Sequence, residues 1–382
     1  MRVLLRMLLV MVAILIVLAA ALHLRYGGGE NFPDRLPGPP RLDASVLEVV
    51  ADLQTPPGNI AVSANGRVFA TLHPEARPDW SVVEIVEGQA RPWPTLEFQH
   101  ADNGEPRAFR DVLSLRIDQQ NRLWTLDNGG HGLHPGRLLA FDLVSGAVVH
   151  EYVFPRELAG LGSHLNDFQV SADGRWIYIA EASFFGKTPA LIVYDVSRGS
   201  ARRLLERHPS VTAEFYTPVV QGRRMLAFGL VAIRPGVDSI VLDAAGEWLY
   251  YAPVTSLNLY RVRTADLHDA ALDAAALAGR VETYAPKTMS DGLTMDQTGT
   301  IYISDLEHSA IVALRPDRSL ETLVQSERLR WPDGFSFGPD GWLYVSCSAL
   351  HQVIGLPPSS VAKHAPYQIL RLQPGSLGTP GH

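Results

Sequence analysis

Acidic and amide side chains recur at one fixed place in a repeated segment of this 382-residue chain. In five of the six copies an Asp or Asn stands seven or eight residues before a turn glycine, as Asn59 stands before Gly66 and Asp291 before Gly299. Equal offsets in repeated units indicate equivalent positions, so we expect these side chains to point toward one common axis. The set is Asn59, Asn166, Asp167, Asp238, Asp291 and Asp333.

Several carboxylates around one channel mouth repel each other, so the pattern predicts a compensating group beside them. That group is a divalent cation such as Ca²⁺, a cationic ligand, water or backbone N–H groups. The alternative interpretation is that each Asp caps a turn, as Asp does in many loops. We favour a ligand site for the set as a whole. Because no Lys or Arg stands at the start of these segments, the predicted ligand is a cation.

Aromatic and imidazole side chains lie close to the same positions in the sequence. Phe184, Phe185 and Trp331 are predicted to stack on a bound cationic or aromatic molecule. His164 and His308 are the candidate acid or base groups, since both stand near the predicted channel mouth. His131 is interpreted as a solvated loop residue. The chain has no serine-nucleophile, phosphate-loop or dinucleotide motif, which disfavours acyl transfer by serine and nucleotide chemistry.

The repeated segment that carries these residues is a short apolar strand, a turn and a strand rich in aromatics. A mostly β repeat of about 40–55 residues is typical of a propeller blade. We therefore predict an all-β fold, a six-bladed β-propeller with four antiparallel strands per blade. The second copy departs from the pattern, because Asp111 stands further from its turn and Ser114 takes the matching place. The six turn positions are Gly66, Asn121, Gly174, Gly246, Gly299 and Gly341.

The sixth copy lacks one of its four strands. Residues 335–338, 342–347 and 367–372 supply three, while residues 45–53 form an apolar strand with no blade of its own. Pairing of these N- and C-terminal strands is predicted to close the ring and to hide edges that would otherwise aggregate. Residues 209–237 are an insertion before the fourth blade. The Ala-rich stretch 268–279 predicts a short helix within the fourth blade itself.

The N-terminal 25 residues predict a signal peptide or a membrane anchor. Arg2 and Arg6 precede a long apolar run without charge. The rest of the chain is therefore expected to be exported, and to be secreted, periplasmic or anchored by this segment. Residues 26–44 predict a Gly/Pro-rich linker, residues 45–373 the propeller, and residues 374–382 a disordered tail.

The composition of the chain limits the classes of binding partner that we expect. The net charge is −7 and the chain has no basic stripe, so nucleic acid is not an expected partner. The single cysteine, Cys347, excludes an intrachain disulfide and is interpreted as a small buried apolar residue. We expect a monomer that takes a small-molecule ligand and meets a membrane only through its N-terminal segment.

Several segments resemble the major royal jelly and yellow proteins, over roughly residues 110–345. The resemblance implies a secreted six-bladed propeller that binds small aromatic amines, with dopachrome tautomerase activity in some insect members. Bacterial relatives are described as dopachrome-tautomerase-related. The predicted function is thus an exported propeller that binds a small cationic or aromatic molecule in its acidic channel. The segments are 122–129, 163–181, 190–210, 249–267 (LYYAPVTSLNLYRVRTADL) and 289–304.

A wider likeness is to the gluconolactonase and regucalcin propellers, which hydrolyse sugar lactones with one divalent metal. It implies a metal site at Asn166, Asp291 and Asp333, which match the Asn-Asp and Asp-Gly pattern of that group. Where those proteins place a metal-binding Glu, this chain has Asn59. A divalent-metal-dependent lactonase and a dopachrome-type tautomerase stand as alternatives to the binding function.

Overall fold

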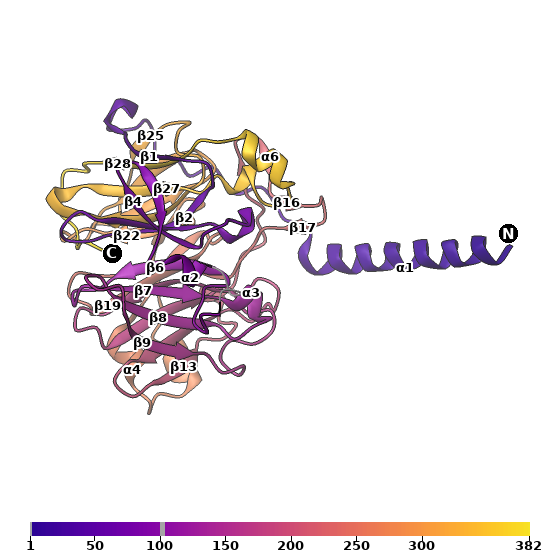
Figure 1. Cartoon of the computed structure of the whole chain (residues 1–382), viewed down its shortest axis with the longest axis horizontal. Coiled ribbons are helices and arrows are strands. Elements are labelled where there is room, and N and C mark those ends of the chain that lie inside the picture. The colour runs from indigo at the N-terminus through magenta and orange to yellow at the C-terminus, as the bar shows by residue number, and fades with distance from the viewer. Residues whose placement is uncertain (1, 100–103) are drawn as a thin grey trace.

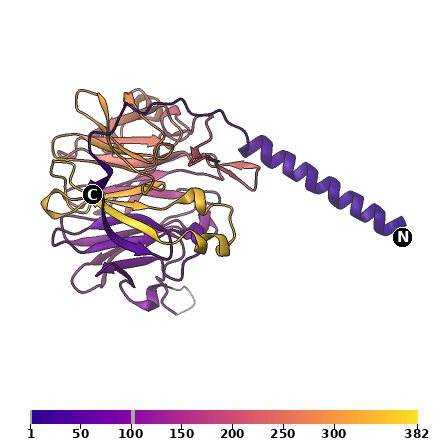
Figure 2. The same ribbon diagram turned by 90° about the horizontal axis from the view of Figure 1, so that it is seen from above.

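The fold is a ring of antiparallel sheets. A computed structural model describes residues 2–99 and 104–382. Within these residues six four-stranded sheets form a six-bladed β-propeller, as predicted, and a long helix projects from one side (Figures 1 and 2). The inner strands of neighbouring blades contact each other around the ring. They therefore surround a central channel.

Each of the first five blades uses four consecutive strands, from the inner to the outer. Blade one has β2 (Pro57–Val62), β3 (Val68–Leu72), β4 (Val82–Val86) and β5 (Gln89–Pro92); blade two has β6 (Val112–Ile117), β7 (Arg122–Asp127), β8 (Arg137–Asp142) and β9 (Val148–Val153). Blade three has β10 (Leu165–Val170), β11 (Trp176–Glu181), β12 (Ala190–Asp195) and β13 (Ser200–Leu204); blade four has β18 (Val237–Leu242), β19 (Trp248–Pro253), β20 (Asn258–Arg263) and β21 (Glu282–Pro286). Blade five has β22 (Leu293–Met295), β23 (Ile301–Asp305), β24 (Ala310–Leu314) and β25 (Leu320–Gln325).

Blade six joins the two ends of the propeller. Its strands are β26 (Pro332–Phe337), β27 (Leu343–Cys347), β28 (Tyr367–Leu372) and β1 (Glu48–Leu53). Glu48 faces Arg371 and Leu53 faces Tyr367 in the antiparallel pairing of β1 with β28. The predicted closure is confirmed, and it leaves β28 without a free edge.

The hydrophobic core lies between neighbouring blades. Every residue of β10 is buried, because blades stack on both faces of the strand. Trp124 of blade two packs in one cluster with Phe168 and Ile192 of blade three. Cys347 is buried in the cluster between blades five and six, as predicted. The fully buried strands β12 (ALIVYD) and β24 (AIVAL) are apolar almost throughout, because both of their faces are covered.

Short helices and hairpins lie in the connections between the blade strands. Residues 209–237 carry two hairpins, and α5 forms inside the Ala-rich stretch, where a helix was predicted. The remaining elements are α1 (Arg2–Tyr26), η1 (Ala44–Val46), η2 (Pro74–Ala76), α2 (Leu96–Gln99), α3 (Gly129–Gly132), η4 (Pro209–Val211), β14 (Val219–Val220), β15 (Arg223–Arg224), β16 (Leu226–Ala227), β17 (Val231–Ala232), α4 (Thr264–His268), α5 (Ala274–Ala278), η5 (Pro339–Gly341), η6 (Leu350–Gln352) and α6 (Pro358–Lys363).

The segment between α1 and the first blade lies along the propeller surface. Glu30 forms an isolated bridge with Tyr216, Phe32 is buried, and the Leu42 N–H donates to the Leu323 carbonyl. The sequence predicts a flexible linker here, because its Gly and Pro residues disfavour regular structure. In the structure this Gly/Pro-rich segment instead packs along the surface of blades four and five, where Arg35 donates to the Leu257 carbonyl and Leu42 to the Leu323 carbonyl.

The last residues of the chain also pack against the propeller. The sequence predicts a disordered tail at 374–382, whereas the Gly381 carbonyl accepts from the Ile117 N–H and the His382 carbonyl accepts from the Phe337 N–H. The His382 ring meets Gln169 Oε1 at 3.0 Å. The tail thus lies across the end of the channel where the inner strands finish.

Candidate functional site

Each acidic or amide residue of the ring lies at or just before the start of an inner strand, and for all of them except Asp291 the strand ladder is interrupted there. The register shifts between Pro57 and Ile60 in β2, and between Val237 and Ser239 in β18. A bulge turns its extra residue out of the ladder. Asn59 and Asp238, which stand at these two bulges, line the central pocket for this reason.

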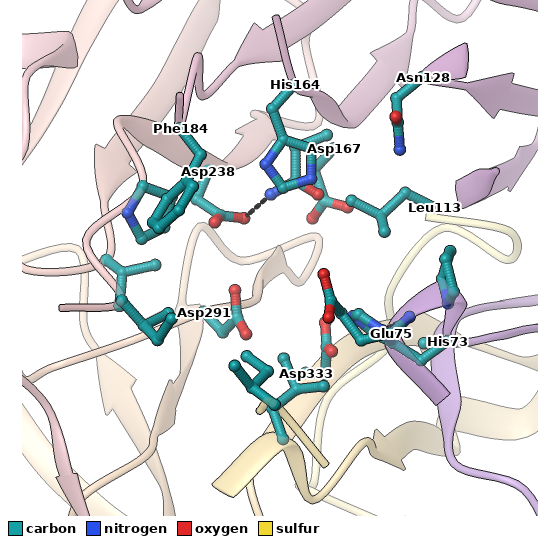
Figure 3. Close-up of a pocket in the computed structure, with 18 of the residues that line it drawn as sticks. His73, Glu75, Leu113, Asn128, His164, Asp167, Phe184, Asp238, Asp291 and Asp333 are labelled. Atoms are coloured by element: carbon teal, nitrogen blue, oxygen red, sulfur yellow. Dashed lines mark hydrogen bonds between the residues drawn. The ribbon is translucent and has the colours of Figure 1, made fainter. Parts of the chain in front are cut away.

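The pocket occupies the channel end at which the inner strands begin, with a cavity volume of about 130 Å³. Figure 3 shows Asp167, Asp238, Asp291 and Asp333 directed into one space, with Phe184 beside them. The six predicted ring residues and Phe184 all line this pocket. Upper walls come from the insertion (Pro218, Ile233, Pro235) and from the loop after β27 (Leu350, Ile354).

Glycines beside the ring residues allow the inner strands to approach one another. A Cβ atom on Gly292 would clash with the Asp333 carbonyl oxygen, and one on Gly334 would lie 2.9 Å from the Asn59 Cα atom. The Asp-Gly pairs in the sequence therefore follow from close backbone packing. They place the carboxylates of neighbouring blades side by side.

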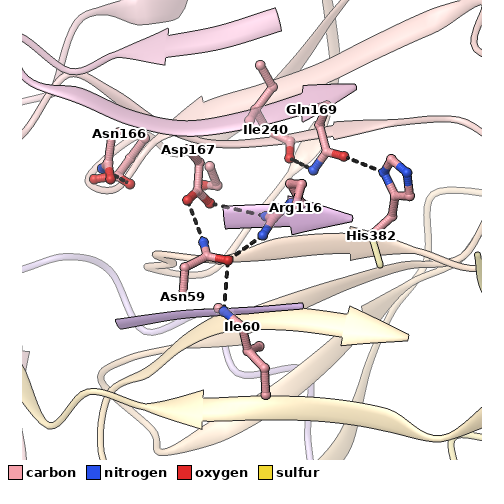
Figure 4. Close-up of polar contacts among 12 residues, drawn as sticks. Asn59, Ile60, Arg116, Asn166, Asp167, Gln169, Ile240 and His382 are labelled. Carbon is pink, nitrogen blue, oxygen red and sulfur yellow. Dashed lines mark hydrogen bonds and ion pairs between the residues drawn. The ribbon is translucent and has the colours of Figure 1, made fainter. Parts of the chain in front are cut away.

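A buried arginine stands below the ring and was missed by the sequence reasoning (Figure 4). Arg116 is 1% exposed; its Nη1 donates to Asn59 Oδ1, and its Nη2 lies 3.7 Å from Asp167 Oδ2. Asn59 Nδ2 donates in turn to Asp167 Oδ1 at 2.7 Å. No Lys or Arg stands at an inner-strand start, but Arg116 reaches the ring from the far half of its strand β6. The sequence signal was a single charge inside the apolar strand 112–117.

Burial sets the protonation of the four carboxyl groups. It raises the pKa of Asp167 to about 6, against the lowering effect of Arg116. Burial and the neighbouring carboxylates hold the pKa values of Asp238 and Asp333 well above their ordinary range. Asp291 has a raised pKa too, moderated by the Trp331 Nε1–H, which donates to its Oδ2 at 2.6 Å. The contact between the Asp238 and Asp291 side chains raises the pKa of Asp238 and lowers that of Asp291, and a proton shared by the pair limits the repulsion within the ring.

A second buried cation lies behind the ring. Lys287 is fully buried, and its Nζ donates to the Val254 carbonyl, the Thr288 carbonyl and Ser290 Oγ at 3.0 to 3.1 Å. Burial lowers the pKa of Lys287 to about 7, although nearby carboxylates raise it. The three acceptors use all three of its N–H groups, so Lys287 holds the backbone of blades four and five together.

Three histidines stand at the rim of the pocket: His73, His131 and His164. The His131 and His164 rings are 4.6 Å apart. Burial lowers the pKa of His131 and, with the neighbouring histidines, holds the pKa of His164 well below its ordinary value. Burial also lowers the pKa of His73 to about 4. All three rings are therefore neutral near pH 7 and able to accept a proton.

The backbone at this rim is strained. His131 and Trp331 have φ angles of 55° and 54°, in the left-handed region that glycine favours. The His131 N–H donates to Asn128 Oδ1, and the preceding Gly129 N–H donates to Asp127 Oδ1, which hold the loop in place. Strained residues that are fixed by surrounding contacts are typical of functional sites.

Three sequence-based assignments differ from the structure. His308 does not line the pocket; its Nδ1 contacts Asp305 at 2.9 Å and its Nε2 lies 3.3 Å from Asp34. His131, interpreted as a solvated loop residue, lines the pocket. In blade two the residue at the bulge is Leu113, not Ser114, so an apolar side chain takes the ring position there.

Two members of the metal set implied by the lactonase likeness, Asn166 and Asp291, have other hydrogen-bond partners in the structure. Asn166 Nδ2 donates to Asp238 Oδ1, and Asp291 accepts from Trp331. Across residues 2–99 and 104–382, no group of three or more His, Cys, Asp or Glu is arranged to hold a metal ion. No cofactor follows from this geometry.

Fold and site together define a six-bladed propeller with an acidic, aromatic-walled pocket at one end of its channel. Residues 111–343 match the profile of the major royal jelly protein family, and the chain belongs to that family. It is 22% identical to major royal jelly protein 9 of Apis mellifera, over 67% of this chain and 62% of that protein. It is 24% identical to major royal jelly protein 1 of the same species, over 62% of this chain and 56% of that protein. The match thus spans about 60% of the relatives' length.

Solved structures with the same fold include lactonase-type propellers. A gluconolactonase from Xanthomonas campestris superposes with a TM-score of 0.53 at 13% identity, over 90% of this chain and 98% of that chain. A calcium-binding regucalcin from Agrobacterium tumefaciens superposes with a TM-score of 0.54 at 15% identity, over 87% and 96%. At such identities the likeness concerns the fold alone.

Proposed function

We propose that this propeller binds a small cationic or aromatic molecule in its central pocket. The observation that carries the proposal is the convergence of Asp167, Asp238, Asp291 and Asp333 on one cavity walled by Phe184 and Trp331. Carboxylates in a partly desolvated cavity attract a cation more strongly than they would in water. An aromatic face beside them adds cation–π and stacking contacts.

Because the carboxyl pKa values are raised, binding of such a ligand is coupled to the release of protons from the pocket. A protonated amine favours ionised carboxylates, so its binding drives protons off Asp238 and Asp333 into the solvent. Binding weakens as the pH falls through about 6, where Asp167 becomes protonated. An exposed Asp, with the ordinary value of about 3.9, would lose its charge two pH units lower.

The test is a thermal-shift panel of aromatic amines, lactones, Ca²⁺ and organic acids near neutral pH, followed by calorimetry of the amine that stabilises most. We expect amines to stabilise the protein, and the binding enthalpy to depend on the buffer because protons are released. Asp291→Asn and Asp333→Asn weaken binding. His308→Ala is the matched control, since His308 lies outside the pocket. Stabilisation by organic acids alone overturns the proposal.

A second candidate function is proton transfer of the tautomerase type. The neutral His131–His164 pair at the rim favours it, because these rings accept and return a proton close to a ligand seated between the rim and the ring. His164→Gln is then expected to abolish isomerisation of an aromatic amine-derived substrate and to leave amine binding intact. Equal turnover by the unaltered protein and by the His164→Gln variant contradicts a catalytic role for His164. A lactone hydrolase would require a metal, and titration with Ca²⁺ in the same panel tests that alternative.

Export of the chain is part of the proposal. Within the described residues, one helix, α1, is long and apolar enough to cross a membrane, and a signal sequence has the same features. Arg2 and Arg6 at its start favour the orientation with the propeller outside the cytoplasm. Detection of the propeller in the exported fraction of the producing cell is the measurement that checks it.

A further inference from the structure

Five of the eleven large exposed apolar side chains of the described propeller lie around the pocket mouth, among them the most exposed aromatic ones. All three exposed phenylalanines of the described chain are there: Phe185 is 43%, Phe215 61% and Phe228 82% exposed. Leu133 and Leu161, at 69% and 78%, stand in adjacent loops. Large apolar groups gathered on one exposed face mark a surface that contacts something other than water.

Contacts between the loops place these residues on one rim. Phe185 itself lines the pocket, and the Gly162 N–H beside Leu161 donates to the His131 carbonyl of the loop that ends at Leu133. Phe228 is at the tip of the β16–β17 hairpin, against Gly355 and next to the pocket residue Ile354. The five apolar residues Leu133, Leu161, Phe185, Phe215 and Phe228 are called the mouth rim below.

The apolar helix α1 leaves the molecule from the same rim. Tyr26 at its end stacks on Phe184 with ring centroids 6.5 Å apart, and the Tyr26 hydroxyl donates to the Phe185 carbonyl at 2.9 Å. The Arg234 Nη2 donates to the Gly27 carbonyl at 2.8 Å. Figures 1 and 2 show α1 on the side that carries α3, α6, β16 and β17. A span that begins at this rim brings the rim to the membrane surface.

Helix α1 has the dimensions of a span. It has 25 residues, a mean hydropathy of 3.0 in its most apolar window, and no buried residue. A bilayer core is crossed by about 20 apolar residues. Its C-terminal end, Arg25 and Tyr26, is a basic and aromatic pair of the kind that anchors helices at the headgroup level.

Basic side chains accompany the apolar rim. Lys187 Nζ lies 4.8 Å from the Phe184 ring centroid, and the Arg234 guanidinium lies 4.4 Å from that of Phe215. Among the described residues neither cation, nor Arg25 nor Arg224, forms an ion pair with a carboxylate. Cations without carboxylate partners, set among exposed aromatics, complement anionic lipid headgroups.

We propose that the mouth rim rests on the outer surface of the bilayer that α1 crosses, so that the pocket opens at the membrane–water interface. The occupant of this surface is lipid. The rim phenylalanines and leucines lie at headgroup depth, and Arg25, Lys187 and Arg224 contact the phosphates, whereas the buried Arg234 holds the end of α1. The orientation follows from the rim and α1 alone, and it is independent of which ligand the pocket takes.

The experiment measures the distance of two opposite sites from lipid in the full chain reconstituted into liposomes. Cys347 is buried, so a single introduced cysteine takes a fluorescent label selectively. Phe228→Cys places the label on the rim. Val144→Cys, 86% exposed, places it at the far end, because the adjacent Leu143 N–H donates to the turn residue Asn121. Lipids carrying a quencher at the headgroup are then added.

The label at 228 is expected to be quenched several-fold more than the label at 144, and less so when anionic lipids are omitted. Leu161→Cys is a second rim site if Phe228→Cys misfolds. Equal quenching at rim and far end means that the propeller tumbles freely on its tether, and stronger quenching at 144 means the opposite orientation. Either result overturns the proposal.

Discussion

Replacing Asp167 by Asn is expected to stabilise the folded protein above pH 6 and to leave its stability nearly unchanged near pH 3, below both pKa values. Burial raises the pKa of Asp167 from 3.8 to about 6, even with Arg116 beside it. Since the folded state prefers this carboxyl group protonated, ionisation removes stability as the pH rises from the unfolded to the folded pKa. At about 1.36 kcal/mol per pH unit, the difference corresponds to about 3 kcal/mol.

The amide introduced by Asp167→Asn is neutral at every pH and can still accept from Asn59, as the protonated carboxyl group does. The free energy of unfolding of both proteins is measured by urea titration in detergent, followed by tryptophan fluorescence at about pH 3 and about pH 8. The curves are expected to nearly coincide at the lower pH. At the higher pH the variant is more stable by about 3 kcal/mol.

Two results would refute this reasoning. A variant that is less stable near pH 8 would mean that the Arg116–Asp167 ion pair stabilises by more than its burial costs. An equal difference at both pH values would mean that titration is not the cause. Asp317→Asn is the control: hydrogen bonds from Ser319 lower the pKa of this exposed turn residue, so its loss brings no gain at high pH.

Three further outcomes are expected. Lys287→Met leaves two buried carbonyl groups without a donor and costs about 1–3 kcal/mol by urea titration; unchanged stability contradicts the role of Lys287 in holding the backbone of blades four and five together. Deletion of residues 1–53 removes β1, exposes the edge of β28 and causes aggregation in light scattering, whereas deletion of 1–26 keeps β1 paired; equal behaviour of the two argues against closure. Cys347, buried and with its pKa raised to about 12, stays unreactive to thiol reagents until the protein unfolds; rapid labelling of the folded protein contradicts this.

The repeat in the sequence was sufficient for the architecture. Six strand–turn–strand copies predict six blades, because a blade cannot bury its own faces and needs neighbours on both sides. The spare strand at 45–53 predicts closure, because the sixth copy lacks one strand. The constant offset from each acidic residue to its turn glycine places Asp238 and Asp333 at equivalent positions, and both line one pocket.

What the repeat could not predict lies outside the repeated positions. Arg116 contacts the ring and Lys287 lies behind it. Both stand at positions that the other blades fill differently, so the repeat in the sequence could not predict these cations. His73 and His131 come from loops whose length and path differ between blades, and His308 turns toward Asp305 rather than toward the axis. The protonation of the carboxylates depends on burial and on distances between blades. Only the closed ring sets these, because it brings residues from distant parts of the chain into one desolvated space.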